Sequence, residues 1–182
     1  MERSSNQIWK STMTSGAILG IALVIYSILL YVGNLLLVKS LGYISYLIIL
    51  GGIYYGIKSF RDNVQGGVIS YGRALGVGVL TVAFAAFIAS FFTYIQVKFI
   101  DPSMLDKILN LTQQQLAESG KSDAEIEMAM KFTQKWITPG FMVISTIFAY
   151  VFIGTLFSLI IAAFMKKEGD PFAEVSNSTE EQ

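Results

Sequence analysis

The chain has 182 residues, of which 53% are hydrophobic and only 14% are charged, against about 25% charged residues in an average soluble domain. A formal net charge of zero argues against nucleic acid as a partner. The sequence contains neither cysteine nor histidine, which excludes disulfides and thiolate nucleophiles and removes the commonest metal ligand and general base.

Four stretches of the sequence contain no Asp, Glu, Lys or Arg. They cover residues 13–37, 41–57, 74–97 and 137–165. An uncharged apolar run of about 18 or more residues is typical of a membrane-spanning helix, and only residues 41–57, at 17, are at the short limit. A chain of this size cannot bury four such helices on all sides in water. We therefore predict an all-α fold with four transmembrane helices.

The predicted spans are approximately 13–37, 41–57, 74–100 and 137–165, within one membrane domain over residues 1–168. The turn after the first span is very short, so the first two spans form an antiparallel pair. The second connection contains the pair Gly66-Gly67, which permits a tight reversal. Residues 169–182 form a tail that is too polar and too short to fold alone, and we expect it to be disordered.

The long polar stretch between the third and fourth spans, residues 101–135, has the capping signals of two helices. Asp101 is a suitable N-cap and Pro102 suits the first helical position. Gly120 is expected to end this helix in a left-handed conformation. Ser122 and Glu125 have the spacing of a capping box for a second helix. The sequence thus predicts an amphipathic helical hairpin between the third and fourth spans.

Each helix of this hairpin has one apolar face. The faces contain Met104, Leu105, Ile108, Leu109, Thr112 and Leu116 in the first helix, and Ile126, Ala129, Met130, Thr133 and Ile137 in the second, with Trp136 at the membrane boundary. Two interpretations stay open. The apolar faces rest on lipid head groups or on each other, or they bind a partner or cover a pore.

The basic residues indicate an orientation in the membrane. The side that holds both termini has Arg3, Lys10, Lys58, Arg61, Arg73, Lys166 and Lys167, and the opposite side has Lys39, Lys98, Lys107, Lys121, Lys131 and Lys135. The basic residues of the first group lie in short segments close to span ends, where positive charge favours the cytoplasmic side. We expect cytoplasmic termini and a hairpin on the outer side of the membrane.

Chemical motifs are missing from the spans, which contain no Asp or Glu, whereas a proton- or ion-coupled transporter usually keeps an ionisable group there. The glycine-rich residues 66–78 lack the Gly-Lys-Ser/Thr of a phosphate loop. We predict no enzyme activity, no catalytic, cofactor-binding or metal-binding residues and no cofactor. The expected role is structural, regulatory or partner-binding. The alternative is a small transporter or transporter subunit completed by a second chain.

Small residues recur one helical turn apart in the spans. These pairs are Gly16/Gly20, Gly52/Gly56, Gly72/Gly76, Ala85/Ala89, Ala86/Ser90 and Gly154/Ser158. Such faces let helix backbones approach closely, which is the main source of attraction between helices in lipid. The pattern predicts close packing within the chain or between chains. The expected partners are therefore the lipid bilayer and either a second copy or another membrane protein.

Several motifs together suggest a family. They are the runs "GGVISYGRALGVGVL", "FTYIQVKFIDPSML", "WITPGFMVIST" and "SLIIAAFMKKE". With these runs, from the first span to Glu168, the chain resembles the bacterial membrane family catalogued as domain of unknown function 4199. The resemblance implies four spans with an intervening soluble helical segment, in a bacterial inner membrane. It implies no activity, because that family is uncharacterised.

Overall fold

Helix α3 (Tyr71–Ile95) is the central element of a bundle of four long helices and packs against the other three. This computed structural model describes residues 2–36 and 38–167, and its other long helices are α1 (Glu2–Val32), α2 (Lys39–Val64) and α6 (Pro139–Met165). Each contains a segment that is long and apolar enough to cross a membrane: Gln7–Val32, Ser40–Val64, Tyr71–Ile100 and Pro139–Met165. The predicted all-helical fold with four apolar helices is confirmed, and it fits a multi-pass membrane protein.

The helices do not coincide with the charge-free runs of the sequence. Helix α1 begins at Glu2, well before residue 13, and ends at Val32, where Asn34 adopts a positive φ of 55° in the turn to α2. Helix α2 has 26 residues and continues past Lys58 through Arg61 and Asp62 to Val64. Charged side chains at its end therefore do not stop the helix. The predicted tail, residues 169–182, lies outside the described residues.

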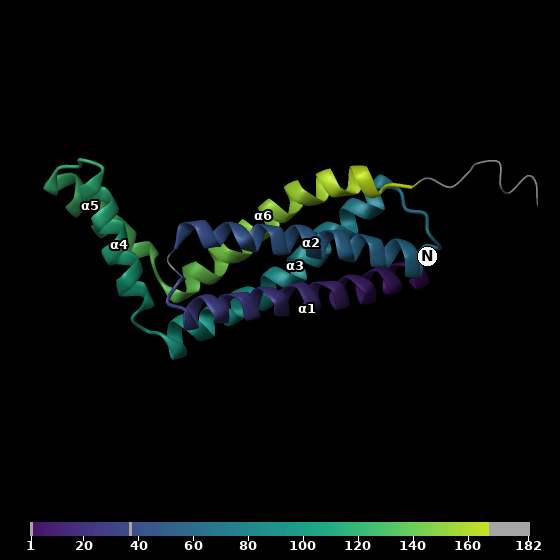
Figure 1. Cartoon of the computed structure of the whole chain (residues 1–182), viewed down its shortest axis with the longest axis horizontal. Coiled ribbons are helices and arrows are strands. Elements are labelled where there is room, and N and C mark those ends of the chain that lie inside the picture. Colours follow the sequence, from purple (N-terminus) through teal and green to yellow (C-terminus); the bar gives the residue numbers. More distant parts are fainter. Residues whose placement is uncertain (1, 37, 168–182) are drawn as a thin grey trace, which may run out of the picture.

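Two ends of the bundle can be distinguished in Figure 1. The start of α1, the α2–α3 connection and the end of α6 lie together at one end, and α4 (Met104–Glu118) and α5 (Asp123–Trp136) project from the other. In the α2–α3 connection, Gly66 and Gly67 have φ of 64° and 92°, conformations that favour glycine. Ile69 then pairs with Lys167 through two backbone hydrogen bonds of 2.9 and 3.0 Å. This bridge joins the connection to the end of α6.

The interior of the bundle is apolar and so is much of its outer surface. Ile49, Ile53, Ile57 and Phe60 form the inner face of α2 and are fully buried. Large apolar side chains also cover the outside, among them Ile21, Ile25, Leu29, Leu47, Phe87, Phe91, Phe148, Phe152 and Phe164. An apolar surface of this extent is unusual for a protein in water, and it is the surface that a lipid environment requires.

At most of the predicted pairs of small residues one turn apart, the helix backbones lie close together. A Cβ atom added at Gly16 of α1 would lie 2.5 Å from Phe84 Cβ and 2.8 Å from the Thr81 carbonyl oxygen, both in α3. Gly154 of α6 meets Val82 in the same way. Within the described chain, these contacts account for close packing without a second copy.

Gly72 and Gly76 do not pack closely against another helix within the described chain. A Cβ atom at either position would have no neighbour within 4 Å, because Ala74 and Val77 are the residues that α3 turns inward. The sequence analysis did not single out Gly78, which lies on the inward face: its added Cβ would be 2.6 Å from Ser158 Oγ.

Two adjacent glycines of α2 give a matched test of this packing. A Cβ atom at Gly52 would lie 2.5 Å from Leu19 Cδ1, whereas one at Gly51 would meet nothing within 4 Å. Because the end of a leucine side chain can shift, we expect Gly52→Ala to lower the free energy of unfolding by about 1 kcal/mol. Gly51→Ala should leave it unchanged or raise it, since alanine favours helix. Thermal unfolding in detergent measures both, and equal melting temperatures would contradict the packing of Gly52 against α1.

Candidate functional site

The junction between α3 and α4 holds a buried acidic group. Helix α3 continues as a π-helix, η1 (Gln96–Ile100), and Asp101 follows it with its side chain only 10% exposed. Its carboxylate accepts hydrogen bonds from Lys107 Nζ at 2.7 Å and from Ser103 Oγ at 2.5 Å. This ion pair ties the first turns of α4 to the end of the third apolar helix.

The predicted start of this helix is wrong by two residues. Helix α4 begins at Met104, with Ser103 rather than Asp101 in the N-cap position. The Asp101 carboxylate binds the Lys107 ammonium and the Ser103 hydroxyl instead, and a backbone turn from Met104 N to Asp101 O, 3.0 Å long, comes before the helix. Pro102 therefore lies in this turn and not in the first helical position.

The ion pair makes this junction sensitive to acid. The hydrogen bond from Lys107, followed by that from Ser103, holds the pKa of Asp101 below its ordinary value of 3.8. A carboxyl whose pKa is lower in the folded state stabilises that state above its unfolded pKa, and this stabilisation is lost as the pH falls through the folded pKa. As the pH falls from about 5 to about 2, through the unfolded pKa and toward the lower folded one, we expect the melting temperature to decrease less steeply in Asp101→Asn than in the unaltered protein.

Asp106 provides the control for this prediction, because it is an exposed carboxylate in α4, the helix that Asp101 precedes. Asp106→Asn should keep the acid-induced decrease of the unaltered protein. If Asp101→Asn and Asp106→Asn change the pH dependence equally, the junction is not the acid-sensitive element.

The turn between α4 and α5 has the predicted capping residues. Gly120, with φ of 74°, follows the end of α4. The Ser122 hydroxyl accepts from Glu125 N at 3.4 Å, and Ser122 N donates to Glu125 Oε2 at 3.0 Å, which forms the capping box of α5. Local sequence signals thus fix the boundaries of both helices at this turn.

The two helices lie side by side (Figure 1) and contact each other. Ile108 and Leu109 of α4 and Ile126 and Met130 of α5 are half-buried, and neither helix has a fully buried side chain. A groove of about 540 Å³ runs between the helices. Its lining residues are Gln113, Ala117, Asp123, Ile126, Glu127, Met130, Lys131 and Gln134. The residues of the groove are mostly polar.

A second surface of α5 is apolar and exposed. Met128, Phe132 and Trp136 are spaced by one turn and are 75%, 67% and 46% exposed; we call them the α5 stripe. The Trp136 ring lies 5.4 Å from the ring of Phe141 at the start of α6. The predicted apolar face of this helix, on Ile126 and Met130, does not include the stripe, although the four-residue spacing up to Trp136 was a usable signal.

Three buried polar atoms in the bundle lack hydrogen-bond partners within the described part of the chain. They are Thr81 Oγ1, Ser158 Oγ and Gln96 Nε2. The other amide atom of Gln96, Oε1, accepts a hydrogen bond from Ser27 Oγ of α1 at 3.2 Å. Ser158 packs against Gly78 between α3 and α6, whereas the Thr81 hydroxyl faces Gly56 of α2. The sequence analysis did not identify these residues, because single hydroxyls in apolar runs are not a specific signal.

Residues 2–36 and 38–167 contain no candidate metal-binding site, because no three His, Cys, Asp or Glu side chains come together there. The arrangement offers hydroxyls, amides and, at the end of the bundle, the ion pair of the buried Asp101 with the half-exposed Lys107. These groups can bind and orient polar molecules, and the predictions of no catalytic, cofactor or metal residues stay predictions.

Comparison with known proteins gives one assignment. The family model described as "Protein of unknown function (DUF4199)" matches residues 14–167, which include α2 to α6 completely and most of α1. No curated protein and no solved structure matches the chain. Since the match extends over most of the sequence and over all four apolar helices, the chain belongs to the DUF4199 family.

Proposed function

We propose that this chain is a non-catalytic multi-pass membrane protein with a structural or partner-binding role, whose helical bundle holds the α4–α5 segment against one surface of the bilayer. The observation that carries the proposal is the α5 stripe. It is exposed, and it is continuous with the exposed apolar side chains Phe141, Ile144, Phe148 and Phe152 of α6.

The continuity of these two surfaces favours lipid as the occupant of the α5 stripe. If α6 crosses the bilayer, its exposed apolar side chains contact acyl chains, and Trp136 beside Phe141 lies at the membrane boundary, where tryptophan is enriched. An amphipathic helix that lies in this interfacial layer buries its apolar face among head groups and acyl chains. Lys135 is exposed on α5 and can reach lipid phosphates.

The groove between α4 and α5 then faces water. Its lining includes two acids, Asp123 and Glu127, and one lysine, Lys131. A polar surface held at a fixed height above the bilayer suits recognition of a partner protein, which agrees with a partner-binding role.

The location in the cell is part of the same proposal. The family resemblance implies a bacterial inner membrane, and the basic residues near the span ends favour cytoplasmic termini. The α4–α5 segment then lies on the outer side.

Depth-dependent fluorescence tests the placement of the α5 stripe. In a background in which both tryptophans, Trp9 and Trp136, are replaced by phenylalanine, Met128→Trp puts the only tryptophan about two turns before the end of α5. We expect dibrominated lipids in proteoliposomes to quench this fluorescence, because position 128 contacts acyl chains. The matched variant Glu127→Trp places the ring in the groove of the same helix, and aqueous iodide should quench it instead.

Quenching of Met128→Trp by iodide, with no effect of brominated lipid, would contradict the interfacial placement. It would assign the α5 stripe to water or to a bound protein.

A further inference from the structure

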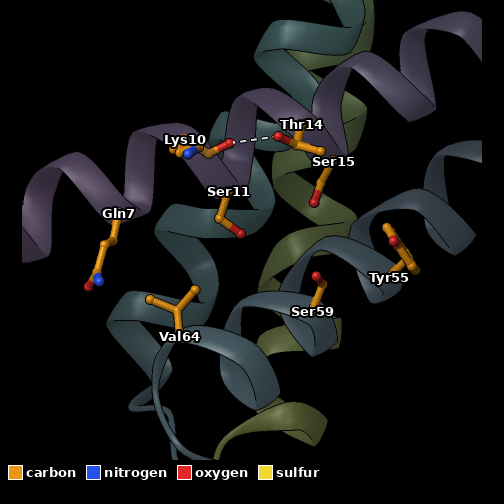
Figure 2. Close-up of a pocket in the computed structure, with 8 residues that line it drawn as sticks. All are labelled: Gln7, Lys10, Ser11, Thr14, Ser15, Tyr55, Ser59 and Val64. Carbon is orange, nitrogen blue, oxygen red and sulfur yellow. Dashed lines mark hydrogen bonds between the residues drawn. The ribbon is translucent and has the colours of Figure 1, made fainter.

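A cleft of about 270 Å³ lies between α1 and α2, at the end of the bundle opposite to α4 and α5. Its lining residues are Gln7, Lys10, Ser11, Thr14, Ser15, Tyr55, Ser59 and Val64. Figure 2 shows the Ser11 and Ser15 hydroxyls directed from α1 toward α2, and the Ser59 hydroxyl directed back toward α1. Side chains from two helices thus turn hydroxyl groups into one space.

The hydroxyl protons of these serines are available to donate hydrogen bonds to a ligand. Ser15 is only 4% exposed, and neither Ser15 nor Ser11 donates to an acceptor elsewhere in the described residues. Ser59 Oγ accepts from Asn63 Nδ2 at 3.2 Å, which leaves its own proton available. All three hydroxyls line the cleft, and each of these groups is a donor as well as an acceptor. The Ser11, Ser15 and Ser59 hydroxyls can therefore donate to a ligand in the cleft.

The positive charge around this end of the bundle favours an anionic ligand in the cleft. The described side chains at this end include six basic groups: Lys10, Lys58, Arg61, Arg73, Lys166 and Lys167. The one described carboxylate among them belongs to Asp62 and pairs with Arg61 Nε at 2.7 Å. Within the cleft, Lys10 supplies a cation and none of the lining residues is acidic.

The cleft also lies at the depth of lipid head groups. Lys10 and Ser11 precede the charge-free run that starts at residue 13, and Ser59 follows the one that ends at residue 57. The edges of these runs mark the edges of the hydrocarbon layer if the helices span a bilayer. A ligand that reaches Ser15 from this level enters between the helices from the interface.

We propose that the cleft between α1 and α2 binds a phosphate group, and that its source is the head group of an anionic glycerophospholipid. Lys10 neutralises the phosphate, and the hydroxyls of Ser11, Ser15 and Ser59 donate hydrogen bonds to its oxygens. Because head-group phosphates occur on both faces of a bilayer, this site does not depend on the orientation of the chain or on the role of α4 and α5.

Native mass spectrometry of the full chain released from detergent micelles tests the site. The probes are phosphatidylglycerol, diacylglycerol with the same acyl chains but no phosphate, and inorganic phosphate. We expect one phosphatidylglycerol to be retained per chain and diacylglycerol to be lost. Ser15→Ala/Ser59→Ala, which removes only two oxygens, should weaken retention about tenfold, as should Lys10→Gln.

Controls separate the site from general charge and from folding. Lys58→Gln removes the same charge from the same end of the bundle outside the cleft, and Ser45→Ala removes a hydroxyl elsewhere in α2; both should retain phosphatidylglycerol normally. Circular dichroism should show unaltered helix content in every variant. Equal retention of diacylglycerol, or an equal loss in Lys10→Gln and Lys58→Gln, would overturn the site. Binding of inorganic phosphate with the same dependence on Lys10 and Ser15, without retention of phosphatidylglycerol, would overturn the lipid as its source.

Discussion

Gly16→Leu is expected to remove most of the folded protein. At this position α1 lies against the backbone of α3, and an added Cβ would be 2.8 Å from the Thr81 carbonyl oxygen and 2.5 Å from Phe84 Cβ. Neither atom can move without the helix, unlike the end of a long side chain. A leucine must therefore separate α1 from α3 along the whole contact. We expect a loss of about 3 kcal/mol or more in the free energy of unfolding, at the upper end of overpacking effects.

Gly76→Leu is the control for Gly16→Leu. Gly76 also belongs to a long apolar helix, but it is exposed and a Cβ there would meet nothing within 4 Å. We expect it to yield as much monodisperse protein in gel filtration as the unaltered chain and to melt at a similar temperature. If both variants behave alike, the contact between α1 and α3 does not stabilise the bundle.

The second large effect is an all-or-none pattern of thiol labelling. The sequence has no cysteine, so that an introduced thiol is the only one in the chain. Ser119→Cys places it in the exposed turn after α4, and Ser70→Cys places it in the exposed connection before α3. With the proposed orientation, a reagent that does not cross the inner membrane should label Ser119→Cys in intact cells. It should label Ser70→Cys only after lysis.

Each other labelling pattern has a distinct meaning. The opposite result would reverse the orientation and place the α4–α5 segment in the cytoplasm. Labelling of both thiols in intact cells would mean that the third apolar helix, formed by α3 and η1, does not cross the membrane. It is the one proposed span between positions 70 and 119.

The large features of the fold could be predicted from the sequence because they depend on composition over many residues. A charge-free run identifies an apolar helix wherever its neighbours lie. The capping box at Ser122 and Glu125 and the turn at Gly120 were also predictable, since each depends on residues within one turn. The start of α4 was not, because the Asp101 carboxylate binds Lys107 and Ser103 instead of capping the helix.

Packing and sites depend on which face each helix turns inward, and one sequence does not fix this. Gly72 and Gly76 have the same spacing as Gly16 and Gly20, but they lie on the outer side of α3. The cleft between α1 and α2 was missed for the same reason. Its serines are unremarkable within their own helices, and only the contact of α1 with α2 brings Ser15 and Ser59 into one space.

The backbone bridge between Ile69 and Lys167 has a consequence for the order in which the chain assembles during synthesis. A nascent chain emerges from its N-terminus, so α1, α2 and α3 can meet before α6 exists. Until then the side of α3 that carries Gly78 and Val82 has no cover, because Ser158 and Gly154 of α6 are its partners. Almost the entire described chain must therefore be synthesised before the backbone hydrogen bonds between Ile69 and Lys167 can form. Formation of that bridge marks completion of the bundle, and any chain that stops before α6 leaves this side of α3 open to lipid or to another helix.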